Sequence, residues 1–258
     1  MNRIFSVILL SGVVLATGCK KKLDIAPPDV VYMNINGASE DIVLTAGNNY
    51  SFFYQIEDNS GVDYVNIKVQ KGFNFETNPE KTAADFFLSN GFDYDQKVKT
   101  EGISFNPPSN VSAGSYRVSV KPSDNNDNNN VERFLDFIVV NGTEPKMTDF
   151  GFSSTTDSLS EVVSARRGDN LVFYGKAESG TDIAKVKIEF LNATKSLLYK
   201  EIPFSGTTDF AVDLKQISDS LKITVDPIWG RGDYKVVVHV IDSNGQAAVK
   251  IFKMKVVY

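Results

Sequence analysis

The side chains that most often carry catalysis or bind metal ions are scarce in this chain. It has one cysteine, Cys19, and one histidine, His239, which lies within an alternating apolar segment. A zinc cluster or a serine–histidine pair needs more of these groups. No glycine-rich phosphate loop joins a strand to a helix, and nothing singles out a glycosidase pair among the carboxylates. We therefore expect no enzyme, no cofactor and no metal site.

Two short motifs allow a binding interpretation beside a structural one. Residues 124–130, DNNDNNN, begin like a calcium loop, but Asn129 replaces its glycine and Leu135 its bidentate glutamate. A polar hairpin tip is the simpler interpretation. Residues 231–233, Arg-Gly-Asp, match an integrin-binding signature, although Gly232 also has a structural explanation beside Tyr234. We keep calcium binding and adhesion as alternatives.

Aromatic side chains are the better candidates for a binding surface. Sugar-binding faces use exposed rings beside polar groups, since a ring covers the apolar face of a pyranose. Phe73, Phe75 and Tyr94 lie in one aromatic-rich segment, and Trp229 precedes the last strands. These four are our candidate ligand-binding residues. Packing in a core is the alternative, because large aromatic side chains dominate cores.

Cys19 follows the pattern of a lipid attachment site. A positive start is followed by the apolar residues 4–14 and by Ala-Thr-Gly directly before the cysteine. The apolar run is too short to span a membrane and is typical of a secretory signal. The segment resembles the bacterial lipobox, which implies a signal peptide at 1–18, a lipidated Cys19 and a tether at 19–29. Lys20 after the cysteine favours the outer membrane by analogy, and the face it occupies stays open.

An internal repeat indicates two copies of one domain. Both copies alternate apolar and polar residues between Gly, Asn, Asp and Pro, a pattern typical of strands. The matching pairs are Gly47 and Gly168, Phe52 and Phe173, Val65 and Val186, Ile67 and Ile188, Tyr116 and Tyr234, and Asp124 and Asp242. We predict domains at 30–140 and 147–258, joined by a linker at 141–146.

The fold class follows from the size of each copy. About 110 residues with several short strands suit an immunoglobulin-like β-sandwich. Tyr116 and Tyr234 each open a late strand after Gly-x, as in the tyrosine corner of such sandwiches. We therefore predict an all-β protein with two tandem immunoglobulin-like sandwiches after a lipoprotein signal peptide.

Residues 232–256, GDYKVVVHVIDSNGQAAVKIFKMKV, resemble the closing strands of PKD-like and bacterial immunoglobulin-like domains. Such domains occur in tandem in outer-membrane lipoproteins of Bacteroidota. The resemblance implies a non-enzymatic binding or scaffold module, with a glycan or an outer-membrane protein as partner, in a nutrient-acquisition complex. A surface adhesin or stalk and a periplasmic structural subunit remain alternatives.

Two further expectations concern modification and partners. Asp-Ser-Leu at Ser158 and at Ser220 resembles the O-glycosylation motif of secreted Bacteroidota proteins. With a net charge of −5 we expect no nucleic-acid partner, because proteins that bind nucleic acids present a basic surface. The lipid anchor makes the membrane itself a partner.

Overall fold

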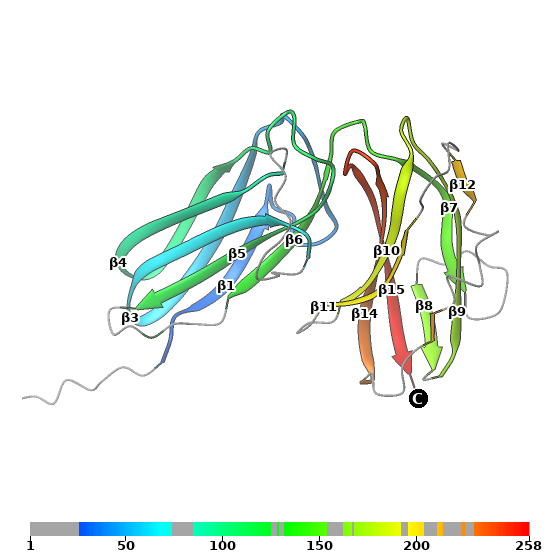
Figure 1. Cartoon of the computed structure of the whole chain (residues 1–258). Helices are drawn as coiled ribbons and strands as arrows, with labels where there is room; N and C mark the ends of the chain where they lie inside the picture. The colour runs from blue at the N-terminus through cyan, green and yellow to red at the C-terminus, as the bar shows by residue number, and fades with distance from the viewer. Residues whose placement is uncertain are drawn as a thin grey trace, which may run out of the picture.

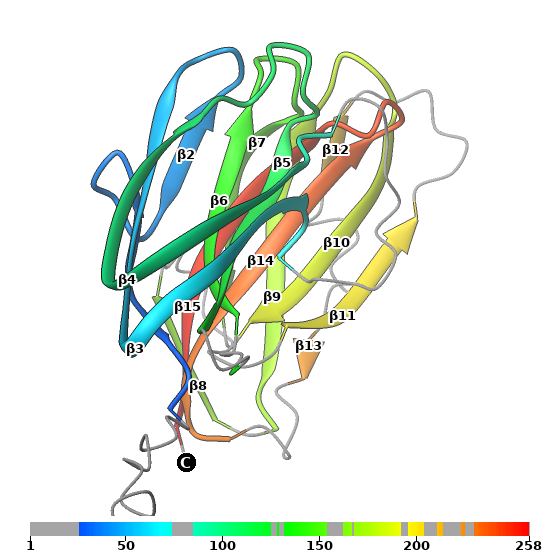
Figure 2. The same ribbon diagram turned by 90° about the vertical axis from the view of Figure 1, so that its left-hand side faces the viewer.

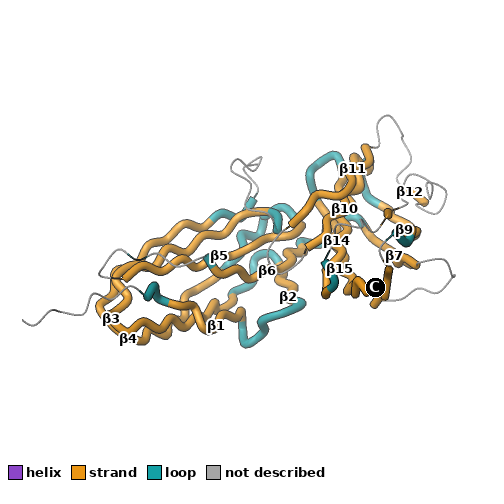
Figure 3. Tube along the Cα trace, turned by 90° about the horizontal axis from the view of Figure 1, so that it is seen from below, coloured by secondary structure: helices purple, strands orange, loops and turns teal. Residues whose placement is uncertain are grey.

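The computed structural model describes residues 26–73, 85–124, 128, 132–153, 162–166, 168–191, 196–203, 211–213, 223–224 and 230–257. All regular elements in these ranges are β-strands, as the trace in Figure 3 displays. None of the described residues forms a helix long and apolar enough to cross a membrane. The prediction of an all-β protein is confirmed.

The first domain contains six strands. They are β1 (Asp29–Ile35), β2 (Ile42–Thr45), β3 (Tyr50–Lys71), β4 (Leu88–Phe105), β5 (Gly114–Asp124) and β6 (Arg133–Val140). The sheet order is β1-β3-β5-β6-β2, with β4 on β3 and β2 parallel to β6. The first half of β3 pairs with β1 and the second half with β5, across an irregularity between Glu57 and Val62. The long β3–β4 hairpin in Figure 1 therefore encloses the core from two sides.

The second domain contains nine strands in two sheets. They are β7 (Lys146–Ser153), β8 (Val162–Arg166), β9 (Asn170–Glu178), β10 (Ile183–Leu191), β11 (Ser196–Pro203), β12 (Ala211–Asp213), β13 (Ile223–Thr224), β14 (Gly232–Asp242) and β15 (Ala247–Val257). One sheet has the order β11-β10-β14-β15-β8, and the other has β12-β9-β13 with β7 on β9. The strands β9 and β10 take the places of the two halves of β3, since β9 pairs with β7 and β10 with β14.

The repeated residues occupy the same structural positions in both domains. Gly47 and Gly168 have φ angles of 80° and 87°, a left-handed conformation that favours glycine. Val65 and Val186 are both fully buried, in separate cores. The alternation of apolar residues in the sequence thus marks the inner face of each sandwich.

Both tyrosine corners are present. The Tyr116 hydroxyl donates to the carbonyl of Ser112 at 2.8 Å, and the Tyr234 hydroxyl donates to the carbonyl of Gly230 at 2.9 Å. Burial, followed by the negative charge of Asp85, raises the pKa of Tyr116 well above its usual range. The first corner is buried and the second is exposed. The same hydrogen bond therefore fixes the start of β5 and of β14 in two different environments.

A short connection joins the last strand of the first sheet to the next strand of the chain. Strand β6 ends at Val140 and β7 starts at Lys146. The Glu144 carboxylate accepts hydrogen bonds from the backbone N–H groups of Asn141 (3.1 Å) and Gly142 (2.8 Å). The connection is therefore a hydrogen-bonded turn.

Candidate functional site

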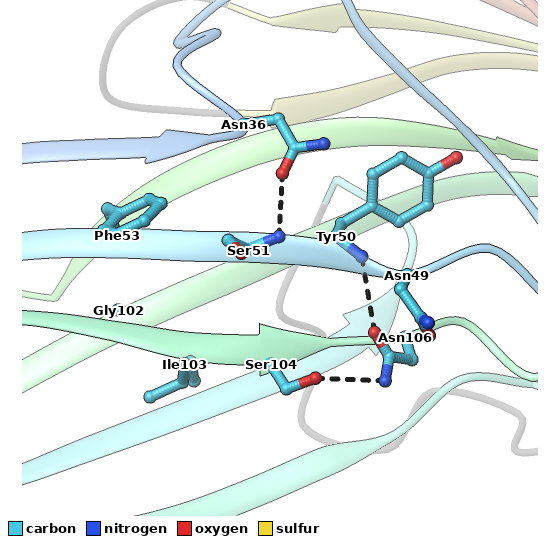
Figure 4. Close-up of a pocket in the computed structure, with 9 residues that line it drawn as sticks. All are labelled: Asn36, Asn49, Tyr50, Ser51, Phe53, Gly102, Ile103, Ser104 and Asn106. Atoms are coloured by element: carbon cyan, nitrogen blue, oxygen red, sulfur yellow. Dashed lines mark hydrogen bonds between the residues drawn. The ribbon is translucent and has the colours of Figure 1, made fainter.

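An open pocket of about 370 Å³ lies on the outer face of the first domain (Figure 4). Strands β3 and β4 build it, together with the turns next to them. Its lining is Asn36, Asn49, Tyr50, Ser51, Phe53, Gly102, Ile103, Ser104 and Asn106. We call it the amide-lined pocket, because three of the nine residues are asparagines and none carries a charge.

Phe53 supplies the aromatic ring of this pocket. Its neighbours Phe52 and Tyr54 are fully buried, and Phe53 points to the opposite side of β3 with 40% of its surface exposed. It pairs directly with Gly102 on β4. A Cβ added to Gly102 would lie 2.5 Å from Cε1 of Phe53, so the ring rests on the glycine backbone. The absence of a side chain at Gly102 is what lets the ring lie against the strand.

The asparagine side chains of the pocket bond to its backbone and still have groups that can hydrogen-bond to a ligand. The Asn36 Oδ1 accepts from the Ser51 N–H at 2.8 Å, and the Asn106 Oδ1 accepts from the Tyr50 N–H at 3.3 Å. Figure 4 places Asn36 on one side of β3 and Asn106 on the other. Within the described part of the chain, neither the Asn36 Nδ2 nor the exposed Asn49 side chain has a hydrogen-bond partner. These amide groups are both donors and acceptors.

A second feature is the interdomain junction, formed by residues 71, 85 and 113 of the first domain, residue 141 of the connection after β6, and residues 245–247 of the second domain. The Gln246 Oε1 accepts from the Ala113 N–H and the Asn141 Nδ2, each at 2.8 Å. The Ala247 N–H donates to the Ala113 carbonyl at 3.1 Å. Figures 1 and 2 display the two domains side by side around this contact.

Lys71 adds a charged contact to the interdomain junction. Its Nζ lies 2.8 Å from Oδ1 of Asp85 and donates to the carbonyl of Gly245 at 3.3 Å. The Asp85 side chain has no exposed surface. The lysine therefore connects a buried carboxylate of the first domain to the β14–β15 turn of the second.

An apolar cluster continues the contact between the domains. Phe73 has no exposed surface and packs with Leu191 and Val237 of the second domain. A cavity of about 420 Å³ lies beside this cluster, and the exposed side chains of Val43 and Phe134 contribute to its wall. The two domains therefore share both polar and apolar contacts.

A buried ion cluster lies on the same face of the second domain. The His239 Nε2 is 2.7 Å from Oε2 of Glu189, and the Lys187 Nζ is 2.9 Å from Oε1 of Glu189. Burial alone would raise the pKa of Glu189. The hydrogen bond and charge of His239, with the charge of Lys187, outweigh burial and lower this pKa to about 2 from 4.5. With both oxygens engaged and ionised, Glu189 is suited to holding β10 and β14 together and unsuited to donating a proton.

Of the four predicted ligand-binding residues, the structure describes the side chain of Phe73 alone. The full burial of Phe73 does not fit an exposed sugar-binding ring; it is an interdomain contact instead. Phe75 and Trp229 lie outside the described residues, and so does the side chain of Tyr94. Cys19, Ser158 and Ser220 also lie outside them.

The two short motifs have the following structural context. Asp124 accepts hydrogen bonds from Asn128 on both carboxylate oxygens, each at 2.8 Å, as expected of a hairpin tip. Asp242, its repeat partner, caps the β14–β15 turn by accepting from the N–H of Gln246 at 2.9 Å. Arg231 and Asp233 are exposed before and at the start of β14. Across the described ranges, no three His, Cys, Asp or Glu side chains gather as a metal site.

The amide-lined pocket was missed by the sequence analysis. Phe52 and Phe53 are consecutive, so only one of them can face the core of a strand. The alternation of Phe52, Tyr54 and Ile56 identifies that face and leaves Phe53 outside. The asparagines did not indicate a binding site in the sequence, because asparagine is also common in turns, where its backbone preference explains it.

The similarities to solved structures concern the fold alone. PorU from Porphyromonas gingivalis is 14% identical, with a TM-score of 0.31 over 90% of this chain. The chain spans only 20% of that protein. The fibronectin(III)-like modules of CbhA from Clostridium thermocellum are 12% identical over 87% of this chain and 93% of that one, with a TM-score of 0.26.

A third similar structure is a segment of two fibronectin type III domains from chicken tenascin. It is 9% identical over 89% of this chain and 99% of that chain, with a TM-score of 0.26. A comparison with curated proteins gives no significant match. At the level of sequence families, residues 18–135 match the family described as "Domain of unknown function (DUF4625)".

Proposed function

We propose that this protein is a non-enzymatic, lipid-anchored module of the outer membrane that binds glycan through the amide-lined pocket. The observation that carries the proposal is the Phe53 ring, which rests on Gly102 with 40% of the residue exposed, in a pocket that is also lined by the amides of Asn36 and Asn49. An aromatic ring stacks on the apolar face of a pyranose, and amides hydrogen-bond to its hydroxyls. The pocket volume of about 370 Å³ falls at the small end of ligand sites.

The rest of the molecule supports a binding role over catalysis. The one histidine is buried beside Glu189, and that carboxylate is held ionised by its neighbours. General acid–base catalysis needs a group that changes its protonation near the working pH and reaches a substrate. Glu189 meets neither requirement, because it is buried and is held ionised by its neighbours.

Lipidation of Cys19 provides the membrane attachment in this proposal. The supporting observation is the signal-like segment before the cysteine. Labelling cells with a radioactive fatty acid tests it, because the wild-type protein would incorporate label and Cys19→Ala would not. Protease treatment of intact cells would then distinguish a protein on the cell surface from one on the periplasmic face.

The binding test compares two exposed phenylalanines of the first domain. We expect the detergent-solubilised full chain to be retarded in native gels that contain a polysaccharide ligand. Phe53→Ala should abolish most of the retardation. Phe134→Ala is the matched control, because Phe134 is 44% exposed and lies outside the amide-lined pocket. Equal retardation of wild type and Phe53→Ala on every gel would refute this site.

A second candidate function is a scaffold that holds an outer-membrane protein partner. The interdomain junction favours it, because Gln246 and Lys71 fix the two domains against each other. Capture of a partner by the wild type and its loss on Gln246→Ala would support the scaffold. Glycan binding that survives this substitution would separate the two functions.

A further inference from the structure

We infer that the amide-lined pocket selects neutral oligosaccharides over anionic ones, and that its ligand extends along the sheet from Phe53 to Tyr32. This inference rests on the proposed function and names its substrate class. Uronic acids and sulfated sugars carry charges that proteins recognise with Arg or Lys, through charge-assisted hydrogen bonds. The nine residues that line the pocket include no charged side chain.

The hydrogen-bonding groups of the pocket match hydroxyls. A sugar hydroxyl can both donate and accept a hydrogen bond. Asparagine and serine side chains also provide both donors and acceptors. The Asn36 Oδ1 is engaged by the Ser51 N–H at 2.8 Å, which leaves its Nδ2 for a ligand oxygen. The exposed Asn49 side chain offers both kinds of group. A carboxylate placed here would lose its hydration and gain no cation, which disfavours an anionic ligand.

The basic residue of β4 that is nearest to the pocket in sequence already has an acidic partner. Lys99 lies on β4 at 2.9 Å from Glu101, and Glu101 is opposite the core residue Tyr54 in the strand register. Neither residue is part of the pocket lining. The nearest basic group on β4 therefore has a carboxylate partner of its own and lies on the other side of the strand from Phe53.

A second exposed ring continues the binding face. Asn34 of β1 is opposite Phe53, and Tyr32 is opposite Gln55, so all four positions belong to one face of the sheet, where Asn34 is buried and the other three reach the surface. Tyr32 is 48% exposed. Diagonal neighbours on adjacent strands lie about 7–8 Å apart, which lets long side chains act together. Two rings at this spacing offer stacking surfaces to successive sugar units, so longer oligosaccharides should bind more tightly than disaccharides.

The experiment measures binding of the detergent-solubilised full chain by calorimetry. The probes are neutral gluco-, xylo- and manno-oligosaccharides, from disaccharides to hexasaccharides, and oligogalacturonates of equal length. We expect a neutral hexasaccharide to bind, and Asn49→Ala and Phe53→Ala each to weaken it about tenfold. Tyr32→Ala should weaken the hexasaccharide and leave the disaccharide unchanged. Asn49 is exposed and unpartnered among the described residues, so its variant should keep the fold even if Phe53→Ala does not.

Three other results of the calorimetry would contradict the inference. Tighter binding of oligogalacturonates than of neutral sugars, weakened by salt, would overturn the neutral specificity and leave the proposed glycan function standing. Neutral binding that is insensitive to all three substitutions would overturn this location. Failure of a folded protein to bind any probe of either series would overturn the inference and the glycan function together.

Discussion

The buried carboxylate of Glu189 should make the second domain sensitive to acid in a predictable range. Glu189 is 1% exposed and contacts His239 and Lys187 at 2.7 and 2.9 Å. Its pKa is lowered to about 2 from an ordinary 4.5. One pKa unit corresponds to about 1.4 kcal/mol, so the ionised carboxylate stabilises the fold by about 3 kcal/mol.

The direction of the pH dependence follows from whether the folded or the unfolded chain binds the proton more tightly. The unfolded chain takes up the proton at the higher pH, because its pKa is the ordinary one. The stabilisation is therefore complete above pH 4.5 and is lost as the pH falls through that value toward 2. A glutamine at this position has no charge to lose, so Glu189→Gln should lack this part of the pH dependence.

Chemical denaturation between pH 6 and pH 2 measures this effect. Far-UV circular dichroism follows the loss of the strands as the chain unfolds. We expect Glu189→Gln to be about 3 kcal/mol less stable than the wild type near pH 6, with the difference vanishing near pH 2. The exposed Glu178→Gln on β9 is the control and should follow the wild type. A constant difference across the whole pH range would refute the role of the charge.

Two further substitutions test the corners and the interdomain junction. Tyr116→Phe leaves the buried Ser112 carbonyl without its hydrogen bond and should cost about 1–3 kcal/mol in urea unfolding, whereas Tyr234→Phe at the exposed corner should cost under about 1 kcal/mol. Equal costs would contradict the difference in burial. Gln246→Ala removes the acceptor shared by two donors of the first domain, and calorimetry should then resolve two separate melting transitions. A single unchanged transition would show that the hydrogen bonds of Gln246 do not carry the coupling between the domains.

The sequence alone was sufficient for the fold class because its signals are local. Strand alternation places Val65 and Val186 in their cores, and the Gly-x-Tyr pairs mark the tyrosine corners. Such patterns depend on the period of two along a strand and need no knowledge of neighbouring strands. The predicted anchor at Cys19 is also a local pattern, and it stays a prediction.

The tertiary structure decided which polar and aromatic residues share a surface. Glu189 and His239 are fifty positions apart and meet because β10 pairs with β14. Phe73 is buried because the second domain covers it. The residues around Phe73 in the sequence do not predict this contact. Phe53 becomes an exposed ring in a pocket because Gly102, on another strand, lies directly beneath it. The strands and their inner faces are thus encoded locally, because they follow from the period of two along the backbone. The candidate site depends on strand register and domain packing, which only the folded chain defines.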